Sequence, residues 1–256
     1  MNYQRKNSIE NKKKRVIYIG LGILTIMFLW VVLSNIYNNS IVIPKIKDVL
    51  SALFELFTQK RIYELLFTML LRILLTVSIS LGISLVLSLM SYKFKHFGNY
   101  LLPIISLLKT TPVIAIIILL ILSVGMELTP YVATSFVIIP MIYEAILAGL
   151  ESIDEAVTDD IKTVTNINFK VLFSFYIPLI ISNIVTALIQ SFGLGLKVML
   201  MAEYISPKNN TFGAEIRRYN ENLEMEKVFA IILVVIVIVM IVDFILKVLK
   251  EKAESK

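Results

Sequence analysis

The 256-residue chain has no cysteine, a single histidine and few charged residues. The missing cysteine excludes disulfide bonds, thiolate metal sites and cysteine nucleophiles. The lone His96 argues against histidine-based triads and metal clusters, and no metal ligand set is predicted. Only 17% of the residues are charged and 57% are hydrophobic, whereas soluble domains are about 45–50% apolar. With a mean hydropathy of +0.83, this composition excludes an ordinary soluble enzyme and indicates a membrane domain.

The apolar residues gather in six continuous runs, each long enough to cross a hydrocarbon core that takes roughly 20 residues of helix. The runs are residues 16–34, 65–90, 101–123, 128–149, 171–202 and 228–246. Barrel strands alternate in polarity over about 10 residues, which these runs do not do, so we expect helices. The fifth run is longer than one span, so part of it must lie outside the membrane core. The sequence therefore predicts an all-α, polytopic membrane protein with six transmembrane helices.

A basic arm, residues 1–15, precedes the first run. Such an arm could belong to a signal peptide, but the run is too long and no small-x-small cleavage site follows it. We expect a retained helix, with residues 16–256 forming a single transmembrane domain. If the arm is cytoplasmic, the loops place 14 lysines and arginines inside and 8 outside, which predicts that both termini are cytoplasmic. The arm is then a topology signal beside anionic lipid of the bilayer, and nucleic acid is not an expected partner.

Charged residues within the runs are candidates for a substrate pathway, because a charge that faces lipid is costly. The candidates within the runs are Arg72, Lys109 and Lys197, and Glu203, directly after the fifth run, is a fourth. The alternative for Arg72 and Lys109 is that the long side chain snorkels to the nearest interface. Lys197 follows two closely spaced glycines, which favour close helix packing, so a dimer interface is a second role for it. Glu144 is interpreted as interfacial, and the three cations in the runs hint at an anionic solute.

Two of the connections have amphipathic character. The segment 43–57, on the outer side, predicts a proline-initiated helix at the interface. The cytoplasmic loop 150–170 is acidic where basic loops are expected, and apolar residues recur in it at helical spacing. These apolar residues include Ile153, Val157, Ile161 and Val164. One interpretation is a solvated helix, and the other is a docking element for a soluble partner.

Around this loop the sequence resembles the permease subunits of binding-protein-dependent ABC importers. Those subunits carry a cytoplasmic motif of the form E-A-A-x3-G-x9-I-x-L-P. Ile177-Pro178 matches the end of the motif, which places Thr165 at the glycine position and Asp159 at the glutamate position. Only Pro178 is identical. Thr165 and the asparagine after it must make the turn that glycine permits in the family, and asparagine tolerates that conformation.

Other segments resemble a narrower group, the permeases for sulfonates, taurine, nitrate and related small molecules. They include the group's P-S-P-x-x-V-L, A-G-L-x-x-V-D and G-L-G-x-x-I motifs. The similar segments are residues 43–50, 68–73, 108–115, 124–125, 148–154, 202–203 and 211–216. Each similarity is weak by itself, but the seven follow one another in the expected order along the six runs.

The resemblance implies a type I ABC importer permease that forms one half of a homodimer in a bacterial cell membrane. Its solute would be small, such as a sulfonate, nitrate, taurine or a small heterocycle. A cytoplasmic ABC ATPase would dock on the loop, and an extracytoplasmic binding protein would deliver the solute. The coupling residues implied are Ile153, Val157, Asp159, Ile161, Val164, Thr165 and Pro178.

The chain contains no G-x-x-x-x-G-K-[ST] motif, so ATP is expected on the ATPase partner, and this chain is expected to have no cofactor and no catalytic residues. An ion-gradient-driven secondary transporter is the alternative, although no internal repeat is visible and acids within the runs are few. An intramembrane enzyme needs paired carboxylates or a nucleophile with its base, and the runs show neither.

Overall fold

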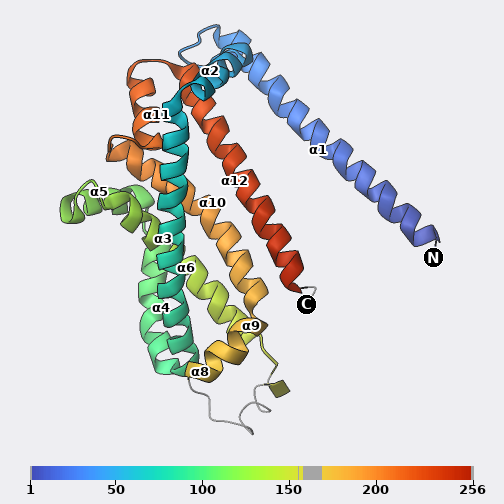
Figure 1. The fold of residues 1–256 in the computed structure, drawn as a ribbon, viewed down its shortest axis with the longest axis vertical. Coiled ribbons are helices and arrows are strands. Elements are labelled where there is room, and N and C mark those ends of the chain that lie inside the picture. The colour runs from blue at the N-terminus through green and yellow to red at the C-terminus, as the bar shows by residue number, and fades with distance from the viewer. Residues whose placement is uncertain (1, 155, 158–168, 255–256) are drawn as a thin grey trace. The chain divides into compact units, whose positions relative to one another are not determined.

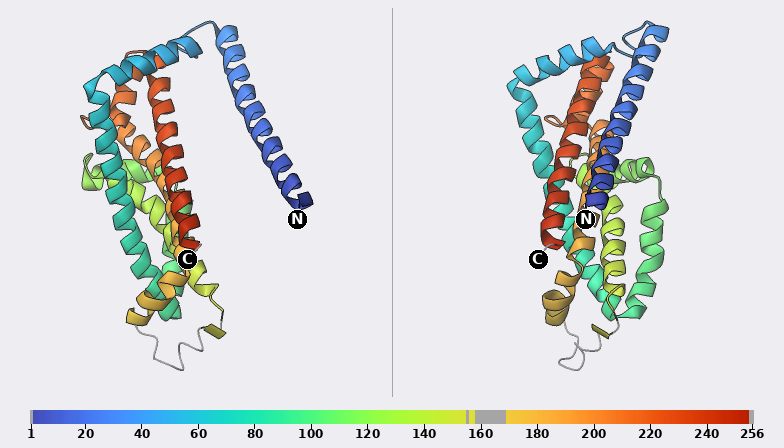
Figure 2. Two further views of the ribbon diagram at one scale, coloured as in Figure 1. Left: turned by 45° about the vertical axis from the view of Figure 1, so that its right-hand side comes forward. Right: turned by 90° about the vertical axis from the view of Figure 1, so that its right-hand side faces the viewer.

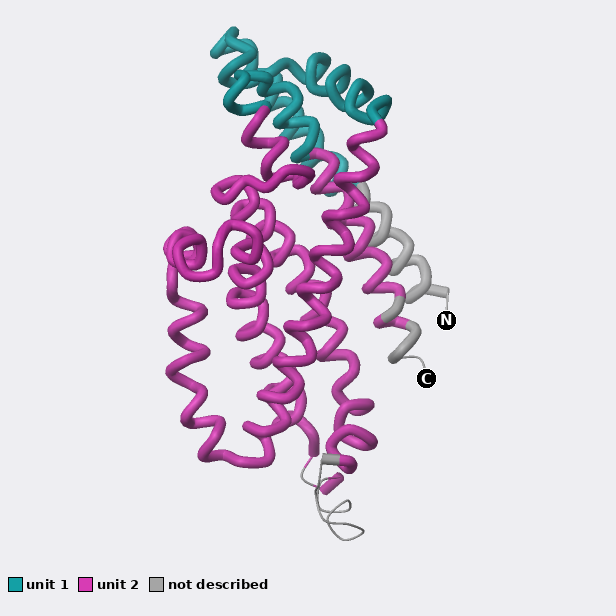
Figure 3. The backbone as a smooth tube through the Cα atoms, turned by 60° about the vertical axis from the view of Figure 1, so that its left-hand side comes forward, with its two compact units in different colours: residues 1–59, 219–232 teal, residues 60–218, 233–256 magenta. Residues whose placement is uncertain are grey.

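The computed structural model describes residues 2–154, 156–157 and 169–254. Within this part every element is a helix, which confirms the predicted all-α class. The chain divides into two compact units, shown in Figure 3. Unit 1 consists of Met1–Gln59 and Tyr219–Ile232, and unit 2 of Lys60–Arg218 and Leu233–Lys256.

Unit 1 contains a long helix, α1 (Asn2–Tyr37), and an amphipathic helix, α2 (Ile46–Thr58). The apolar stretch of α1 is almost unburied within the chain, as expected of a helix that lies in lipid or against another subunit. The loop between the helices is attached to α1 by Trp30, whose Nε1–H donates to the carbonyl oxygen of Pro44 at 3.0 Å. The Trp30 ring also contacts Phe229, with ring centroids 5.5 Å apart.

Helix α2 begins two residues after Pro44 and confirms the predicted amphipathic segment. Val49 and Leu56 are buried on one side, while Leu50 and Phe54 are exposed. Lysine, glutamate and aspartate side chains interrupt its apolar surface, so the helix suits the boundary between lipid and water better than the hydrocarbon core.

Unit 2 holds the remaining membrane helices, which are labelled in Figure 1. In chain order they are α3 (Lys60–Lys93), α4 (Lys95–Thr110), α5 (Val113–Val124), α6 (Thr129–Glu151), α8 (Phe169–Val171), the π-helix η1 (Leu172–Tyr176), α9 (Ile177–Leu179) and α10 (Ile181–Ile205). Two further helices, α11 (Phe212–Glu221) and α12 (Met225–Glu254), have residues in both units.

Five of the described helices are long and apolar enough to cross a membrane, and a sixth span results if the bent pair α4 and α5 is counted as one. The expectation of a continuous helix over 101–123 is therefore wrong, because α4 and α5 meet at 102°. Thr111 has an extended backbone, as a residue before proline prefers. Pro112 has no N–H with which to continue the α4 ladder. Figure 1 shows α5 turned away from the direction of α4.

The run 171–202 is longer than one membrane span, and the structure divides it into several helices. Its first part forms the short elements α8, η1 and α9, and α10 supplies the span. The segment that follows this run is partly helical, because α10 extends to Ile205 and residues 212–221 form α11. Glu203 is consequently a helix residue that is 1% exposed.

The core of unit 2 is made where α6 packs along both α3 and α10, which Figure 2 shows from two further directions. The three helices meet at Gly195 of α10. A Cβ atom there would lie 3.2 Å from side-chain atoms of both Ile73 on α3 and Thr134 on α6. A small residue at this position allows the close helix contact that drives packing in lipid.

A row of buried serines joins α3 to α6. Ser84 Oγ donates to the carbonyl oxygen of Ile139 at 3.0 Å, and Ser88 Oγ lies 3.1 Å from the carbonyl oxygen of Tyr143. The Tyr143 hydroxyl in turn donates to Ser91 Oγ at 3.0 Å. Interhelical hydrogen bonds of this kind stabilise helix pairs where no water competes, so α3 and α6 form a fixed frame for the neighbouring cleft.

Candidate functional site

The break between α4 and α5 borders a cleft of about 560 Å³ in unit 2. Three helical regions form its walls: the α4–α5 break, the middle of α6 and one face of α10. The lining residues are Leu108, Lys109, Thr111, Val113, Val137, Met141, Glu144, Ala145, Gln190 and Leu194. A mostly apolar wall with a few polar groups, placed at a broken span, is typical of a solute site in a transporter.

An ion pair stands in this cleft. Lys109 Nζ donates to both carboxylate oxygens of Glu144, each at 2.7 Å. The two side chains come from α4 and α6 and are 48% and 46% exposed, respectively. The sequence identified Lys109 as a pathway candidate but not its partner, because Glu144 was interpreted as interfacial. The only available signal was the presence of opposite charges in neighbouring runs.

Lys197 lies on α10 outside the set of lining residues, and its side chain is exposed. It follows Leu194 by three positions and Gln190 by seven, so helical spacing puts all three on one face of α10. The rise from Leu194 to Lys197 is about 4.5 Å along the axis. Lys197 therefore extends the cleft face of α10 by one turn.

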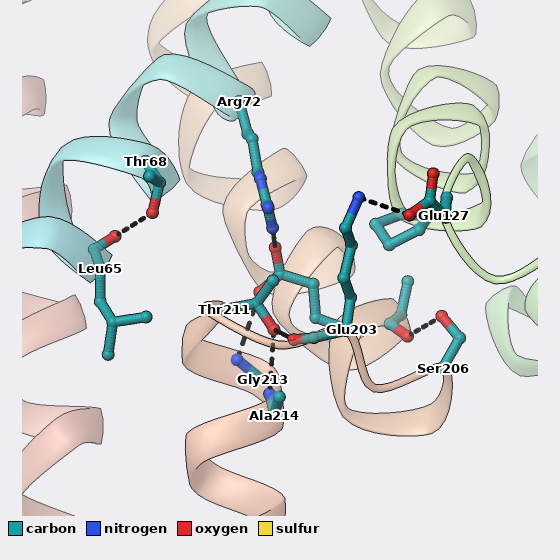
Figure 4. A network of polar contacts seen from close by, with 12 residues as sticks. Leu65, Thr68, Arg72, Glu127, Glu203, Ser206, Thr211, Gly213 and Ala214 are labelled. Carbon is teal, nitrogen blue, oxygen red and sulfur yellow. Dashed lines mark hydrogen bonds and ion pairs between the residues drawn. The ribbon is translucent and has the colours of Figure 1, made fainter. Parts of the chain in front are cut away.

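The other two pathway candidates contact each other. Arg72 Nη1 of α3 donates to Oε1 of Glu203 of α10 at 3.1 Å, as Figure 4 shows. The second Glu203 oxygen, Oε2, accepts the backbone N–H of Gly213 at 3.2 Å. Both oxygens of this buried carboxylate are thus bonded, which is what a buried charge requires. The contacts of Arg72 and Glu203 join α3, α10 and α11.

Gly213 permits the close approach of α11 to α10. A Cβ atom at this position would lie 2.4 Å from Glu203 Cβ and 2.6 Å from the backbone nitrogen of Tyr204. Neighbouring Glu215 is also buried and forms ion pairs with Arg61 of α3 and Arg218 of α11. The sequence singled out Gly213 only as part of the segment 211–216, which resembles the G-L-G-x-x-I motif. The residues around Gly213 in the sequence do not indicate its contact with α10.

A further ion pair lies in the adjoining loops. Lys208 Nζ, after α10, is 2.8 Å from Glu127 Oε1, before α6. The hydrogen bond from Lys208, together with its charge, lowers the pKa of Glu127 from its ordinary value. The pair is therefore formed at neutral pH and is lost as the pH falls through the lowered pKa of Glu127.

The segment predicted to couple to an ATPase is described only at its ends. Ile153 is half-buried just after α6, and the Val157 side chain is exposed. Pro178 lies in α9 and is exposed. The other four predicted residues, Asp159, Ile161, Val164 and Thr165, lie outside the described residues.

The end of this segment is attached to the helices of unit 2. Leu172, Tyr176 and Ile180 recur every four residues through the π-helix and α9, and all three are buried. The Tyr176 ring lies against that of Tyr92 at the end of α3, with centroids 5.6 Å apart. These contacts pack the end of the segment against the end of α3. In the described ranges no group of three or more acidic or histidine side chains is arranged to hold a metal ion.

Comparison with known proteins agrees with this architecture. Residues 78–255 match the model of a family described as "Binding-protein-dependent transport system inner membrane component". No curated protein matches the chain. A solved structure described as the crystal structure of an amino acid ABC transporter with histidines is similar in fold, with a TM-score of 0.59 and 18% identity. The similarity covers 78% of this chain and 94% of the other.

Proposed function

The chain belongs to the family of inner membrane components of binding-protein-dependent transport systems, and from this premise we propose that the cleft at the α4–α5 break is its solute path. The protein is a membrane-spanning permease subunit of an ABC importer and not an enzyme. The observation that supports the proposed path is the Lys109–Glu144 pair, which places two charges in a cleft whose other lining residues are uncharged. Ionisable residues within membrane spans commonly mark solute or ion pathways.

The family works with an ATPase and a substrate-binding protein, and the ion-gradient-driven alternative is not favoured. We assign ATP hydrolysis to a separate cytoplasmic ATPase, since the sequence contains no phosphate-binding loop. A binding protein on the outer side would deliver the solute. The basic arm and the distribution of lysine and arginine support a bacterial cell membrane location with both termini in the cytoplasm.

We assign the protein to a homodimer, in which a second copy covers the cleft. The cleft is open on one side of unit 2, and apolar side chains of α5, including Ile114, Ile118 and Leu122, are exposed beside it. A solute path through a membrane must be enclosed by protein, and one copy encloses only part of it.

The solute that we propose is a small molecule of the sulfonate, taurine, nitrate or small heterocycle type. The seven segments that resemble the permeases for such molecules support this assignment.

We assign the ATPase contact to the loop 150–170, with Ile153, Val157, Asp159, Ile161, Val164, Thr165 and Pro178 as coupling residues. The exposed Val157 side chain supports this, because an apolar residue in a cytoplasmic loop is available to a partner. Burial of two or three such side chains contributes about 1.5–3 kcal/mol each before the cost of association. The buried anchor at Tyr176 would pass the movement on to the spans.

The test is the double variant Val157→Asp with Ile161→Asp, made in cells that express the protein with its ATPase. Two carboxylates in an apolar contact are expected to release the ATPase from the purified permease and to abolish uptake. Permease abundance should not change. His96→Asp is the control, since it adds an acid at an exposed position outside the loop and should leave the ATPase bound. Normal co-purification with the double variant would refute the docking role.

A further inference from the structure

The charges of the cleft are balanced. Among its ten lining residues the only charged ones are Lys109 and Glu144. The hint of an anionic solute came from three cations in the predicted spans. Arg72 is neutralised by Glu203, and Lys109 by Glu144, whereas the third cation, Lys197, lies outside the lining residues of the cleft. A solute in the cleft therefore meets one charge of each sign, at two side chains from facing helices.

Both members of the pair keep the capacity to bind a solute. An ammonium has three N–H donors, and Lys109 uses two of them on Glu144. A carboxylate has about four acceptor positions, of which Lys109 occupies two. Because each side chain is about half exposed, the remaining donor of Lys109 and the remaining acceptors of Glu144 are open to the cleft.

The same pattern continues beyond Glu144. This residue also borders a second cavity of about 420 Å³, whose lining includes Lys95 and Glu151. This second lining holds both signs of charge, with one lysine, Lys95, and two glutamates, Glu144 and Glu151. A solute that carries only a negative charge would be repelled by Glu144 in both cavities. A solute that carries only a positive charge would be repelled by Lys109 in the first cavity and by Lys95 in the second.

We propose that the cleft selects a small zwitterion, a solute with an ammonium group and an acid group, and that Glu144 binds the ammonium while Lys109 binds the acid. This inference rests on the proposed function, because it assigns the charge class of the transported solute. Lys197 lies one turn farther along α10, outside the lining residues of the cleft, and is not part of the proposed pair. Among the proposed solute types the charges favour taurine over nitrate, and they extend the expected solutes to amino acids.

The experiment measures thermal stabilisation of the purified full-length permease by small probes that differ only in charge. Taurine and alanine are the zwitterions. Ethanesulfonate and propionate lack the amine, and ethylammonium lacks the acid. The zwitterions are expected to raise the melting temperature at concentrations about tenfold or more below those of the single-charge analogues, because each charge-assisted hydrogen bond is worth a factor of that order.

Variants separate the two charges. Glu144→Gln is expected to bind ethanesulfonate as well as taurine, and Lys109→Met to bind ethylammonium as well as taurine. Glu144→Asp, which restores the carboxylate, should recover part of the preference. The matched control is Lys208→Met with Glu127→Gln, which removes a lysine–glutamate pair of similar length outside the cleft and should keep the wild-type profile.

The proposal is overturned if the wild-type protein binds an anion or ethylammonium as tightly as the zwitterions, or if neither zwitterion stabilises it. It is also overturned if Glu144→Gln retains the preference for taurine. ATPase co-purification distinguishes this failure from failure of the proposed function. If the wild-type permease retains its ATPase but shows no zwitterion preference, the importer role stands and the charge assignment falls.

Discussion

Single residues hold α3, α10 and α11 together through one charged contact and one close backbone approach. The Glu203 carboxylate is held by Arg72 on one side and by the Gly213 N–H on the other (Figure 4). Removing Arg72 would leave a buried carboxylate without a counter-charge, which costs more than the pair contributes when intact. Arg72 is 18% exposed whereas Glu203 is 1% exposed, so the arginine can find water more easily than its partner.

Gly213→Ala tests the steric side of this contact. Its methyl group would overlap Glu203 Cβ and the Tyr204 backbone, so α11 must move and the Glu203 hydrogen bond must lengthen. We expect a loss of about 1–3 kcal/mol, the usual cost of overpacking, measured as a lower melting temperature in detergent.

Gly82→Ala is the matched control, because nothing lies within 4 Å of the added methyl group. In the middle of α3 this change should stabilise the helix by up to about 1 kcal/mol. Equal melting temperatures for the Gly213 variant and the wild type would show that α11 does not depend on this approach.

At the scale of elements, two helix pairs of unit 2 differ in structure: α3 and α6 are joined side by side, whereas α4 and α5 form a bent span. Helices α3 and α6 are joined by serine hydrogen bonds along their length. The α4–α5 pair, in contrast, is bent by 102° at Thr111–Pro112. The cleft lies between the two: the fixed pair holds Glu144 on α6, and the broken pair supplies Lys109 and Thr111 beside the bend.

Ser84→Ala combined with Ser88→Ala tests the frame. Each interhelical hydrogen bond in a membrane is worth about 0.6 kcal/mol on average, so the double variant should lose about 1 kcal/mol of stability by unfolding measurements. Ser123→Ala is the control, since its hydroxyl is exposed and bonds only within α5. Identical stability of the double variant and the control would mean that apolar packing alone joins α3 to α6.

At the scale of the whole molecule, most of the apolar surface of the spans is unburied in a single copy. The most apolar window is 6% buried in α1 and reaches 44% in α6 and α10. Such surface needs lipid or a second subunit to cover it. This agrees with the multi-pass membrane protein that the family match indicates.

The membrane orientation is tested by single cysteines, for which a chain without native cysteine is a clean background. We expect Lys208→Cys to react with a membrane-impermeant maleimide in intact cells, because its loop is predicted to be external. Lys256→Cys should react only after the cells are opened, since the arginine and lysine distribution predicts a cytoplasmic C-terminus. The unmodified chain, which should not react, is the control. Labelling of Lys256→Cys in intact cells would contradict the predicted topology.

The sequence by itself determined the properties that depend on local composition. Six apolar runs, the amphipathic α2 and the all-helical class follow from hydropathy and periodicity, because a helix in lipid must satisfy its backbone internally. Even the bend in the third span had a local signal in Pro112, although proline alone does not distinguish a gentle kink from a 102° turn.

Only the tertiary structure decided which charges meet. Lys109 and Glu144 are 35 positions apart, and Arg72 and Glu203 are 131 apart. The sequence marked Arg72 and Lys109 as costly in lipid, but their partners depend on how α3, α4, α6 and α10 are rotated against one another. That rotation is set by packing at sites such as Gly195 and by the serine row. The same packing leaves no room for a side chain at Gly213. It also places one positive and one negative side chain, Lys109 and Glu144, among the lining residues of the cleft.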